Sequence, residues 1–301
     1  MNRIEIKGII PPIITPMHAD ESINTAELRR QVDRQIENGV HALFCFGTNG
    51  EGYILDGREK QLVLETVIEQ ANGRVPVYAG TGCVSTRETI AQSRMARDAG
   101  ADVLSIITPS FAAASQQELY DHYRAVAEAV DIPIVLYNIP ARTGNALAPE
   151  TVARLSRIEN IVGAKDSSGN WDNMKAYLDG TRGSGFAVLS GNDGLILDCL
   201  KTGGRGGVAG CANVTPAPWR LFMIVLPRAI WKKRRNIRRA SRPSAHASNT
   251  ATRIRSSKQP WRCWATTWEN AAHRSTSSRK KALPRCGRCF VRMRKRGCTD
   301  P

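Results

Sequence analysis

Acidic residues are scarce in one part of this sequence: residues 222–301 contain only Glu269 and Asp300, beside 22 lysines and arginines. Residues 1–221 carry 21 basic and 25 acidic residues. The formal charge is therefore −4 before residue 222 and +20 after it, and the total of +16 describes neither part. A charge of +16 spread evenly along the chain would indicate a protein that binds a polyanion. The split excludes that interpretation for the first part of the chain.

Long apolar runs and nucleotide-binding loops are also missing. No run reaches the roughly 20 apolar residues of a membrane-spanning helix, and the first residues, MNRIEIKGII, have no hydrophobic signal core. Neither GxGxxG nor GxxxxGK[ST] occurs where a phosphate-binding loop would need it. We therefore expect a cytoplasmic protein with no membrane partner.

The eight cysteines do not form a metal-binding pattern. Cys286 and Cys289 make a lone CxxC, and a zinc site would need a second pair at suitable spacing. Four more are scattered through apolar segments, as expected of reduced thiols in a protein core: Cys45, Cys83, Cys199 and Cys211. We predict no metal and no organic cofactor.

The first two thirds of the chain repeat one pattern, an apolar run of strand length followed by an amphipathic segment of helix length. The apolar runs are 8–16, 42–47, 75–82, 102–109, 132–140, 161–168, 186–193 and 206–213. The amphipathic segments are 25–39, 58–72, 86–100, 116–130, 148–158, 170–181 and 195–203. Ser85 with Glu88 predicts a capping box, and Gly39, Gly73 and Gly100 stand where helices should end.

Strands that are apolar throughout and alternate with helices are typical of a parallel sheet covered by helices. Eight such units favour a closed α/β fold, the (β/α)8 TIM barrel, over an open doubly wound sheet. We predict that residues 1–218 form this barrel. In such a barrel the chemistry lies where strands end and helices begin, so the polar residues at the strand ends are the candidates.

The second predicted strand ends in GTNGEG, which makes a tight turn of Thr48, Asn49, Gly50 and Glu51. Backbone N–H groups of such a turn suit a carboxylate, although a simple strand-to-helix turn explains the same residues. The fifth strand ends in YNIPARTG, with Tyr137, Asn138 and Arg142. Arg142 is either a clamp for an acidic ligand or one half of a surface ion pair.

Lys165 follows small and apolar residues in IVGAKDSSG, at the end of the sixth predicted strand. Its stem would begin inside the barrel, where desolvation disfavours a charged ammonium. Two interpretations stay open from position alone. The lysine either pairs with the adjoining Asp166 or serves as an amine nucleophile whose pKa falls from about 10.4 toward neutrality.

Taken together, the motifs resemble one family. PPIITP, GTNGEG, GRVPVYAGTG, ADVLSIITPSF, YNIPARTG, IVGAKDSSG and LSGND, in this order and spacing, are similar to the dihydrodipicolinate synthase and N-acetylneuraminate lyase family over residues 4 to about 218. The resemblance implies a (β/α)8 barrel without cofactor that acts on a small-molecule 2-oxo acid. It also implies a homo-oligomer with no nucleic-acid partner. For a chain with an undisturbed reading frame, that oligomer would be a tetramer.

The resemblance assigns roles to single residues. Lys165 would form a Schiff base with the keto carbon of pyruvate, Tyr137 would shuttle protons beside it, and Thr48 would relay them. Thr48 and Asn49 would bind the carboxylate, and Arg142 would hold an acidic second substrate. Gly191 and Val208 complete the implied substrate-binding set.

Two residues depart from the family's pattern. Phe111 stands where the synthases carry a tyrosine donated across a subunit interface, and a phenyl ring does not relay a proton. Asn49 replaces the second threonine of the usual turn. We expect a class I lyase of lysine biosynthesis that condenses pyruvate with aspartate semialdehyde. The alternatives are a 2-keto-3-deoxy sugar-acid or related 2-oxo-acid aldolase, and an inactive product.

Residues 219–301 break the pattern, and we interpret them as translated in a shifted frame. Back-translating residues 249–275 and displacing the frame by two bases permits HGNPNTIVKAAVALLGYDVGECRAPF. That string resembles the family's C-terminal pattern of NP, IK, LLG, G and RxP. The alternative is a basic, disordered nucleic-acid arm. In the shifted-frame interpretation the last barrel helix and the C-terminal helical extension are replaced by an aberrant basic tail, which we expect to destabilise the chain as written.

Overall fold

The computed structural model of the protein describes residues 4–217 together with Trp219 and Met223. The chain divides into two units, Met1–Pro260 and Trp261–Pro301, and all described residues belong to the first. The predicted aberrant tail therefore lies outside the described residues, apart from Trp219 and Met223.

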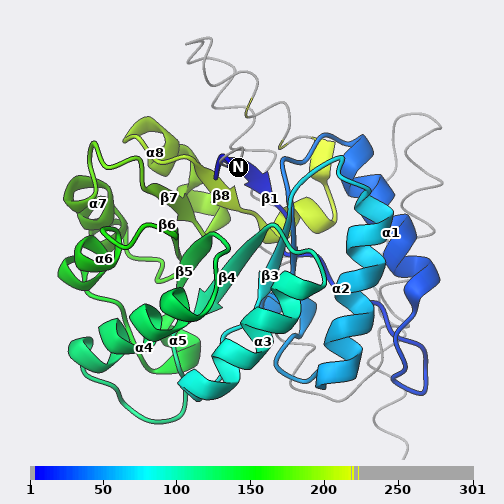
Figure 1. Ribbon diagram of the computed structural model, residues 1–301. Coiled ribbons are helices and arrows are strands. Elements are labelled where there is room, and N and C mark those ends of the chain that lie inside the picture. Colours follow the sequence, from blue (N-terminus) through cyan, green and yellow to red (C-terminus); the bar gives the residue numbers. More distant parts are fainter. Residues whose placement is uncertain (1–3, 218, 220–222, 224–301) are drawn as a thin grey trace, which may run out of the picture. The chain divides into compact units, whose positions relative to one another are not determined.

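Eight parallel strands form one sheet in which the neighbours run β1-β8-β7-β6-β5-β4-β3-β2 (Figure 1). The remaining gap, between β1 and β2, is spanned by a bridge from Pro12 to Phe44, so the sheet curls into a barrel. Each strand lies inside one of the eight predicted apolar runs, which confirms the predicted TIM barrel. The strands are Gly8–Ile10 (β1), Leu43–Cys45 (β2), Val77–Gly80 (β3), Val103–Ile107 (β4), Ile134–Asn138 (β5), Ile161–Asp166 (β6), Ala187–Ser190 (β7) and Gly206–Val208 (β8).

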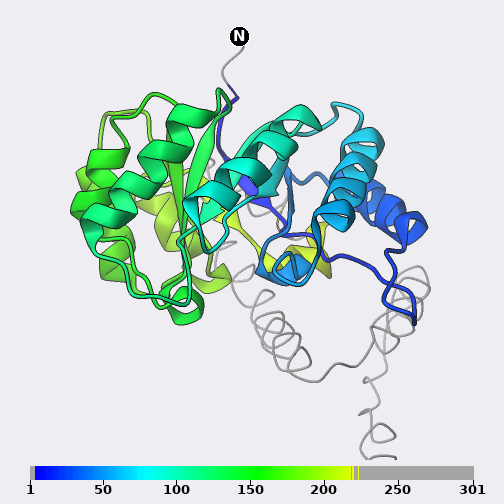
Figure 2. The same cartoon turned by 60° about the horizontal axis from the view of Figure 1, so that its bottom comes forward.

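Helices alternate with the strands and lie outside the barrel (Figures 1 and 2). Seven of them fall on the predicted amphipathic segments: Thr25–Glu37 (α1), Gly57–Ala71 (α2), Thr86–Asp98 (α3), Gln116–Ala129 (α4), Pro149–Leu155 (α6), Trp171–Gly180 (α7) and Ile196–Lys201 (α8). The short helix α5, Pro140–Thr143, and three 3-10 turns were not predicted: Thr48–Gly50 (η1), Asp193–Leu195 (η2) and Gly210–Asn213 (η3). In the described part of the chain no helix has the length and apolar character needed to cross a membrane.

The helix starts follow local side-chain chemistry. Asp56 caps α2 through the Glu59 backbone N–H while the Glu59 carboxylate accepts from the Asp56 N–H, a complete capping box. At α3, the Ser85 hydroxyl accepts from the Glu88 N–H (3.1 Å), but the Glu88 carboxylate accepts from Gln92 instead (3.0 Å). The predicted capping box at α3 is thus only half formed.

Alternation along each strand divides the core into two layers. One set of side chains packs between the sheet and the helices, and it includes Leu104, Leu136 and Ala164. The other set fills the barrel interior, and it includes Phe44, Tyr78, Val103, Val135, Tyr137, Leu189 and Val208. Residues 137 and 165 are partners in the register of β5 and β6, so Lys165 shares the interior with Tyr137.

Candidate active site

Lys165 and Tyr137 meet inside the barrel, where β5 and β6 end. Both side chains are 4% exposed. The Lys165 Nζ lies 3.6 Å from the centre of the Tyr137 ring and 5.2 Å from that of Phe44. The rings of Phe44 and Tyr137 pack edge to face with their centroids 6.4 Å apart. Burial takes the amine out of water, which disfavours its charged form, whereas the ring faces attract a cation and offset part of that effect.

Burial therefore lowers the pKa of the Lys165 ammonium below its ordinary value, and the neighbouring Tyr137 and Asp193 offset only part of that effect. A lowered pKa increases the fraction of unprotonated amine at neutral pH, which is the form that attacks a carbonyl.

The alternative pairing of Lys165 with Asp166 is wrong. Consecutive residues of a strand point to opposite faces, so Asp166 faces away from the barrel interior. Its carboxylate accepts from the Asn138 side-chain amide (2.9 Å) and from the Ser168 hydroxyl (2.9 Å). Asn138 in turn accepts from the Leu147 N–H (3.0 Å) and so holds the loop that follows α5 against the end of β5.

The Tyr137 phenol is the centre of a hydroxyl network. Its Oη lies 3.0 Å from the Thr48 Oγ1, within hydrogen-bonding distance. Burial by itself would raise the pKa of the phenol, but the Lys165 charge and hydrogen bonds from Thr48, Lys165 and Ser167 outweigh it, so the pKa is lowered. A phenol of lowered pKa next to an amine and two hydroxyls can exchange protons with an intermediate on that amine.

The turn after β2 is the 3-10 turn η1, which carries Thr48 and Asn49. Two of its N–H groups are used within the turn, since the Gly50 N–H donates to the Gly47 carbonyl (2.9 Å) and the Glu51 N–H to that of Thr48 (3.4 Å). These two groups are therefore engaged, and the predicted carboxylate site has to rely on Thr48 and Asn49 themselves.

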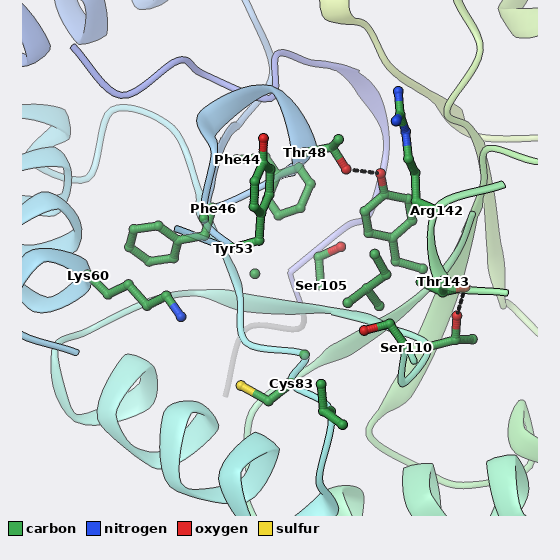
Figure 3. Close-up of a pocket in the computed structure, with 17 residues that line it drawn as sticks. Phe44, Phe46, Thr48, Tyr53, Lys60, Cys83, Ser105, Ser110, Arg142 and Thr143 are labelled. Atoms are coloured by element: carbon green, nitrogen blue, oxygen red, sulfur yellow. Dashed lines mark hydrogen bonds between the residues drawn. The ribbon is translucent and has the colours of Figure 1, made fainter. Parts of the chain in front are cut away.

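A cavity of about 640 Å³ opens above these residues. Thr48, Tyr137 and Arg142 line it, whereas Lys165, Asn49, Gly191 and Val208 are not among its lining residues. The amine lies beside the Tyr137 ring, and Tyr137 itself lines the cavity. In Figure 3 a dashed line marks the hydrogen bond of Thr48, and Arg142 lies next to it.

Arg142 is exposed at the rim of the cavity, on α5. Pro140 begins this helix and Gly144, with φ 77°, ends it, so it is limited to one turn. The Thr143 hydroxyl beside it accepts from that of Thr108 (2.8 Å), which ties α5 to the end of β4. Among residues 4–217 Arg142 has no ion-pair partner, so the surface-pair alternative is not observed.

The structure also places the last two predicted site residues. A Cβ at Gly191 would lie 1.8 Å from the Ser167 Oγ and 2.8 Å from the Lys165 Cε, so this glycine leaves room for the lysine stem. Val208 is buried in the interior cluster that contains Tyr137. Both are close to the centre without lining the cavity.

Sequence reasoning missed three residues near this centre. Ser167, two residues after Lys165, hydrogen-bonds the phenol. Asp193 is partly buried, accepts from the Gly210 (3.1 Å) and Cys211 (3.0 Å) N–H groups, and lies close enough to Lys165 to act on its charge. The third, Lys60, lines the cavity from α2. The period-2 rule could have found Ser167, which follows Lys165 on the same strand face, whereas Asp193 and Lys60 come from other elements.

Phe111 stands apart from the cavity of its own chain. It is 99% exposed, does not line the cavity although Ser110 does, and has a left-handed φ of 81°. An aromatic residue rarely adopts that conformation. The cysteines differ in one case from the prediction of core thiols: Cys45, Cys199 and Cys211 are buried, whereas Cys83 is partly exposed and lines the cavity.

Comparison with known families gives one match over most of the chain. The sequence model of the dihydrodipicolinate synthetase family matches residues 5–229. A 4-hydroxy-tetrahydrodipicolinate synthase of Cellvibrio japonicus is 40% identical over 212 residues, which are 70% of this chain and 73% of that protein.

Solved structures agree with this similarity. A chloride-inhibited dihydrodipicolinate synthase of Acinetobacter baumannii, complexed with pyruvate, superposes with a TM-score of 0.79 at 32% identity, over 97% of both chains. YagE, a prophage protein of the dihydrodipicolinic acid synthase family from Escherichia coli K12, also in complex with pyruvate, gives 0.76 at 31% identity, over 78% of this chain and 80% of that one.

Proposed function

The chain belongs to the dihydrodipicolinate synthetase family, and on that premise we propose that it is a 4-hydroxy-tetrahydrodipicolinate synthase. In this proposal it condenses pyruvate with aspartate semialdehyde through a Schiff base on Lys165. The observation that carries the proposal is the buried amine 3.6 Å from the Tyr137 ring centre, next to a phenol that shares a hydrogen bond with Thr48. Pyruvate in the complexes of two family members supports the choice of 2-oxo acid.

The first step uses the neutral amine. The Lys165 Nζ attacks the keto carbon of pyruvate, and loss of water from the carbinolamine gives a protonated imine. Tyr137 supplies the proton that the departing hydroxyl needs and takes it back from the Thr48 relay. Because the pyruvate carboxylate is negative, Thr48 and Asn49 hold it through their side-chain donors.

The second step forms the carbon–carbon bond. The protonated imine acidifies the adjacent methyl group, and transfer of that proton to the Tyr137–Thr48 relay gives an enamine. The enamine carbon attacks the aldehyde of the second substrate, whose oxygen takes the proton back from the same relay. Arg142 is the candidate clamp for the carboxylate of that substrate, since a guanidinium binds a carboxylate through two parallel hydrogen bonds. The amino group of the second substrate then attacks the imine carbon, which closes the ring and displaces the Lys165 amine for the next turnover.

Borohydride trapping tests the first step. Reduction in the presence of pyruvate should add the mass of the reduced adduct to the peptide that contains Lys165, and Lys165→Met should abolish the label. The labelling rate should rise with pH through the lowered amine pKa and level off above it. Absence of label from a folded preparation would refute the proposal.

A second candidate is an aldolase for 2-keto-3-deoxy sugar acids. The phenyl ring of Phe111 favours it, because this position offers no hydroxyl where the resemblance places the tyrosine of the synthases. Imine formation is common to both candidates, so borohydride trapping does not distinguish them. Parallel assays with pyruvate plus aspartate semialdehyde and with pyruvate plus short hydroxyaldehydes do.

The oligomeric state of the chain is also a proposal. Four large apolar side chains are strongly exposed: Tyr53 (65%), Ile54 (57%), Val84 (61%) and Phe111 (99%). Tyr53 and Val84 line the cavity, and Phe111 adjoins its lining residue Ser110. Exposed apolar groups gathered in this way are typical of a covered surface. We expect a homo-oligomer, with a tetramer as the specific prediction, and light scattering would give the mass.

We also propose that residues from about Trp219 onward result from a shifted reading frame. Sequence similarity covers 70% of this chain and 73% of the Cellvibrio protein, so nearly equal shares of both chains are left unmatched. A frame change replaces a segment without altering the overall length much, whereas an added arm would lengthen the chain. Resequencing the gene around the Trp219 codon tests this, and an unchanged sequence would favour the basic arm.

A further inference from the structure

Asp193 is a carboxylate near the site that the steps of the proposed reaction do not use. It begins η2, the turn after β7, and is partly buried. One of its oxygens accepts from the Gly210 N–H (3.1 Å) and the other from the Cys211 N–H (3.0 Å), at the start of η3 after β8. This one side chain therefore ties the end of β7 to the end of β8, and both of its oxygens are fixed in direction.

The loop that carries Asp193 lies against the stem of Lys165. The Gly191 N–H donates to the Asp166 carbonyl (2.7 Å), which holds the start of the loop on β6. A Cβ at Gly191 would lie only 2.8 Å from the Lys165 Cε, the carbon that bears the amine. The carboxylate therefore follows, by two residues, a backbone position in contact with the lysine.

The charges of Asp193 and Lys165 act on each other. Burial lowers the pKa of the Lys165 ammonium, and Tyr137 and Asp193 oppose that effect. Burial raises the pKa of the Asp193 carboxyl, and the donors of η3 together with the Lys165 charge oppose it. Since each group affects the titration of the other, the two are electrostatic neighbours.

The surroundings of the amine contain little other charge. Among residues 4–217, Tyr137 and Asp193 are the ionisable groups that act on the Lys165 charge. The side chain that faces the amine from β2 is the uncharged Phe44, and Asp166 of β6 faces away. No ion pair within the same part of the chain involves Asp193. Its carboxylate therefore has neutral donors on η3 and a cationic neighbour in Lys165.

We propose that Asp193 is a positioning residue that supplies the counter-charge for the Lys165 nitrogen. The inference rests on the proposed function, in which that nitrogen is positive in the protonated imine. A carboxylate already held by two N–H groups stabilises this charge without having to reorient, and the barrel interior screens the interaction less than water would. Asp193 acts through the lysine nitrogen and needs no contact with either substrate.

The pKa of the Lys165 amine tests the counter-charge without any substrate. Competitive labelling of the full-length protein with trace acetic anhydride, followed by mass spectrometry of the Lys165 peptide, gives this pKa. In Asp193→Asn it should fall by about one unit or more, because an opposite charge has been removed. A merely structural role predicts the reverse, since a loosened loop admits water and returns the pKa toward about 10.4.

Asp102→Asn is the matched control. Asp102 also accepts from a backbone N–H, that of Val77 (2.8 Å), but it does so where β3 and β4 begin, at the other end of the strands from Lys165. This substitution removes the same charge and the same kind of bond, and the pKa of Lys165 should not change. An unchanged or raised pKa in Asp193→Asn would overturn the proposal, and so would an equal fall in Asp102→Asn.

The reciprocal measurement serves if Asp193→Asn does not fold. In Lys165→Met the pKa of Asp193, followed by the NMR shift of its carboxylate carbon, should rise, because a pairwise interaction is the same from either group. An Asp193 pKa equal to that of the wild type would overturn the proposal.

Borohydride trapping with pyruvate links the counter-charge to the imine. At a pH above the amine pKa, trapping should be about tenfold slower in Asp193→Asn, because the protonated imine is the species that borohydride reduces. An unchanged rate would contradict the proposal. If the wild type itself traps no pyruvate, the proposed function fails, whereas the titration of the amine still decides the role of Asp193.

Discussion

The reactivity of a single lysine in this protein depends on what replaces its water. Lys165 has ring faces and a phenol around it, and its carboxylate neighbour on the strand points away. Sequence position predicted that the amine enters the barrel but left its partner open. The partner is Tyr137 from the adjacent strand, and only the register of β5 and β6 identifies it.

Gly191 is expected to control the position of this amine. In Gly191→Ala the new Cβ would lie 1.8 Å from the Ser167 Oγ and 2.8 Å from the Lys165 Cε, so the lysine must shift. A displacement of the order of 1 Å at a reacting group costs roughly 100-fold in rate. The rate of borohydride trapping with pyruvate should fall accordingly. Gly57→Ala, where a Cβ meets no atom within 4 Å, is the matched control.

Phe111→Tyr tests whether a missing hydroxyl limits the condensation. The two side chains have the same backbone requirement at φ 81°, so folding should be unaffected. If position 111 relays a proton, kcat for pyruvate plus aspartate semialdehyde should rise by at least about tenfold, a modest share of what acid–base catalysis contributes. Imine trapping should not change. An unaltered kcat would show that this position does not relay protons here.

At the scale of elements, the apolar runs predicted every strand and the amphipathic spacing predicted seven helices. Helix α5 escaped because four residues give no period to detect, and Pro140 suggested a stiff loop. The hydrogen bonds that support α5 could not be predicted from the sequence either. Asn145 donates to the carbonyls of Pro109 (2.9 Å) and Ala112 (2.7 Å) and accepts from the Ala114 N–H (2.8 Å), contacts with residues more than thirty positions away.

Removing that support should affect one substrate only. Asn145→Ala leaves three polar groups without their partner, which should lower the free energy of unfolding by about 2–4 kcal/mol and loosen the loop that carries Arg142. KM for aspartate semialdehyde should rise about tenfold, while trapping of pyruvate changes less than about twofold.

Asn160 is the matched control, since it donates to the carbonyls of Ala127 and Val130 (both 2.9 Å) just before β6, away from the strand ends of the site. Asn160→Ala should lose stability without the KM effect, and equal KM changes in both would contradict the argument.

For the molecule as a whole, His122 couples stability to pH. It lies between α3 and α4, where its Nδ1 contacts the Thr86 hydroxyl (2.9 Å) and its Nε2 has no hydrogen-bond partner among the described residues. Burial lowers the pKa of His122 to about 4. The unfolded chain, with an ordinary pKa near 6.5, binds the proton more readily, so stability is fully present above pH 6.5 and is lost as pH falls toward 4.

The loss from this residue should be on the order of 2–3 kcal/mol between pH 7 and pH 4. Denaturant unfolding measured across that range should show a steeper decline in the wild type than in His122→Leu, which cannot take up the proton. At pH 8 the two curves need not coincide in height, since only the slopes are compared. Parallel slopes would show that His122 does not bind a proton on unfolding in this range.

We expect the barrel to open locally most often where β1 meets β2. Pro11 and Pro12 have no N–H to donate, and the strands are held there by bonds from His41 to Ile9 (2.9 Å), from Phe44 to Pro11 (3.1 Å) and from Ile13 to Phe44 (3.0 Å). We expect the Phe44 and Ile13 amides to exchange with deuterium sooner than those of β4 and β5. Because β2 leads directly into Thr48, each such opening would briefly move the Thr48 hydroxyl away from the Tyr137 phenol. The same motion would then control both amide exchange between β1 and β2 and proton transfer to Lys165.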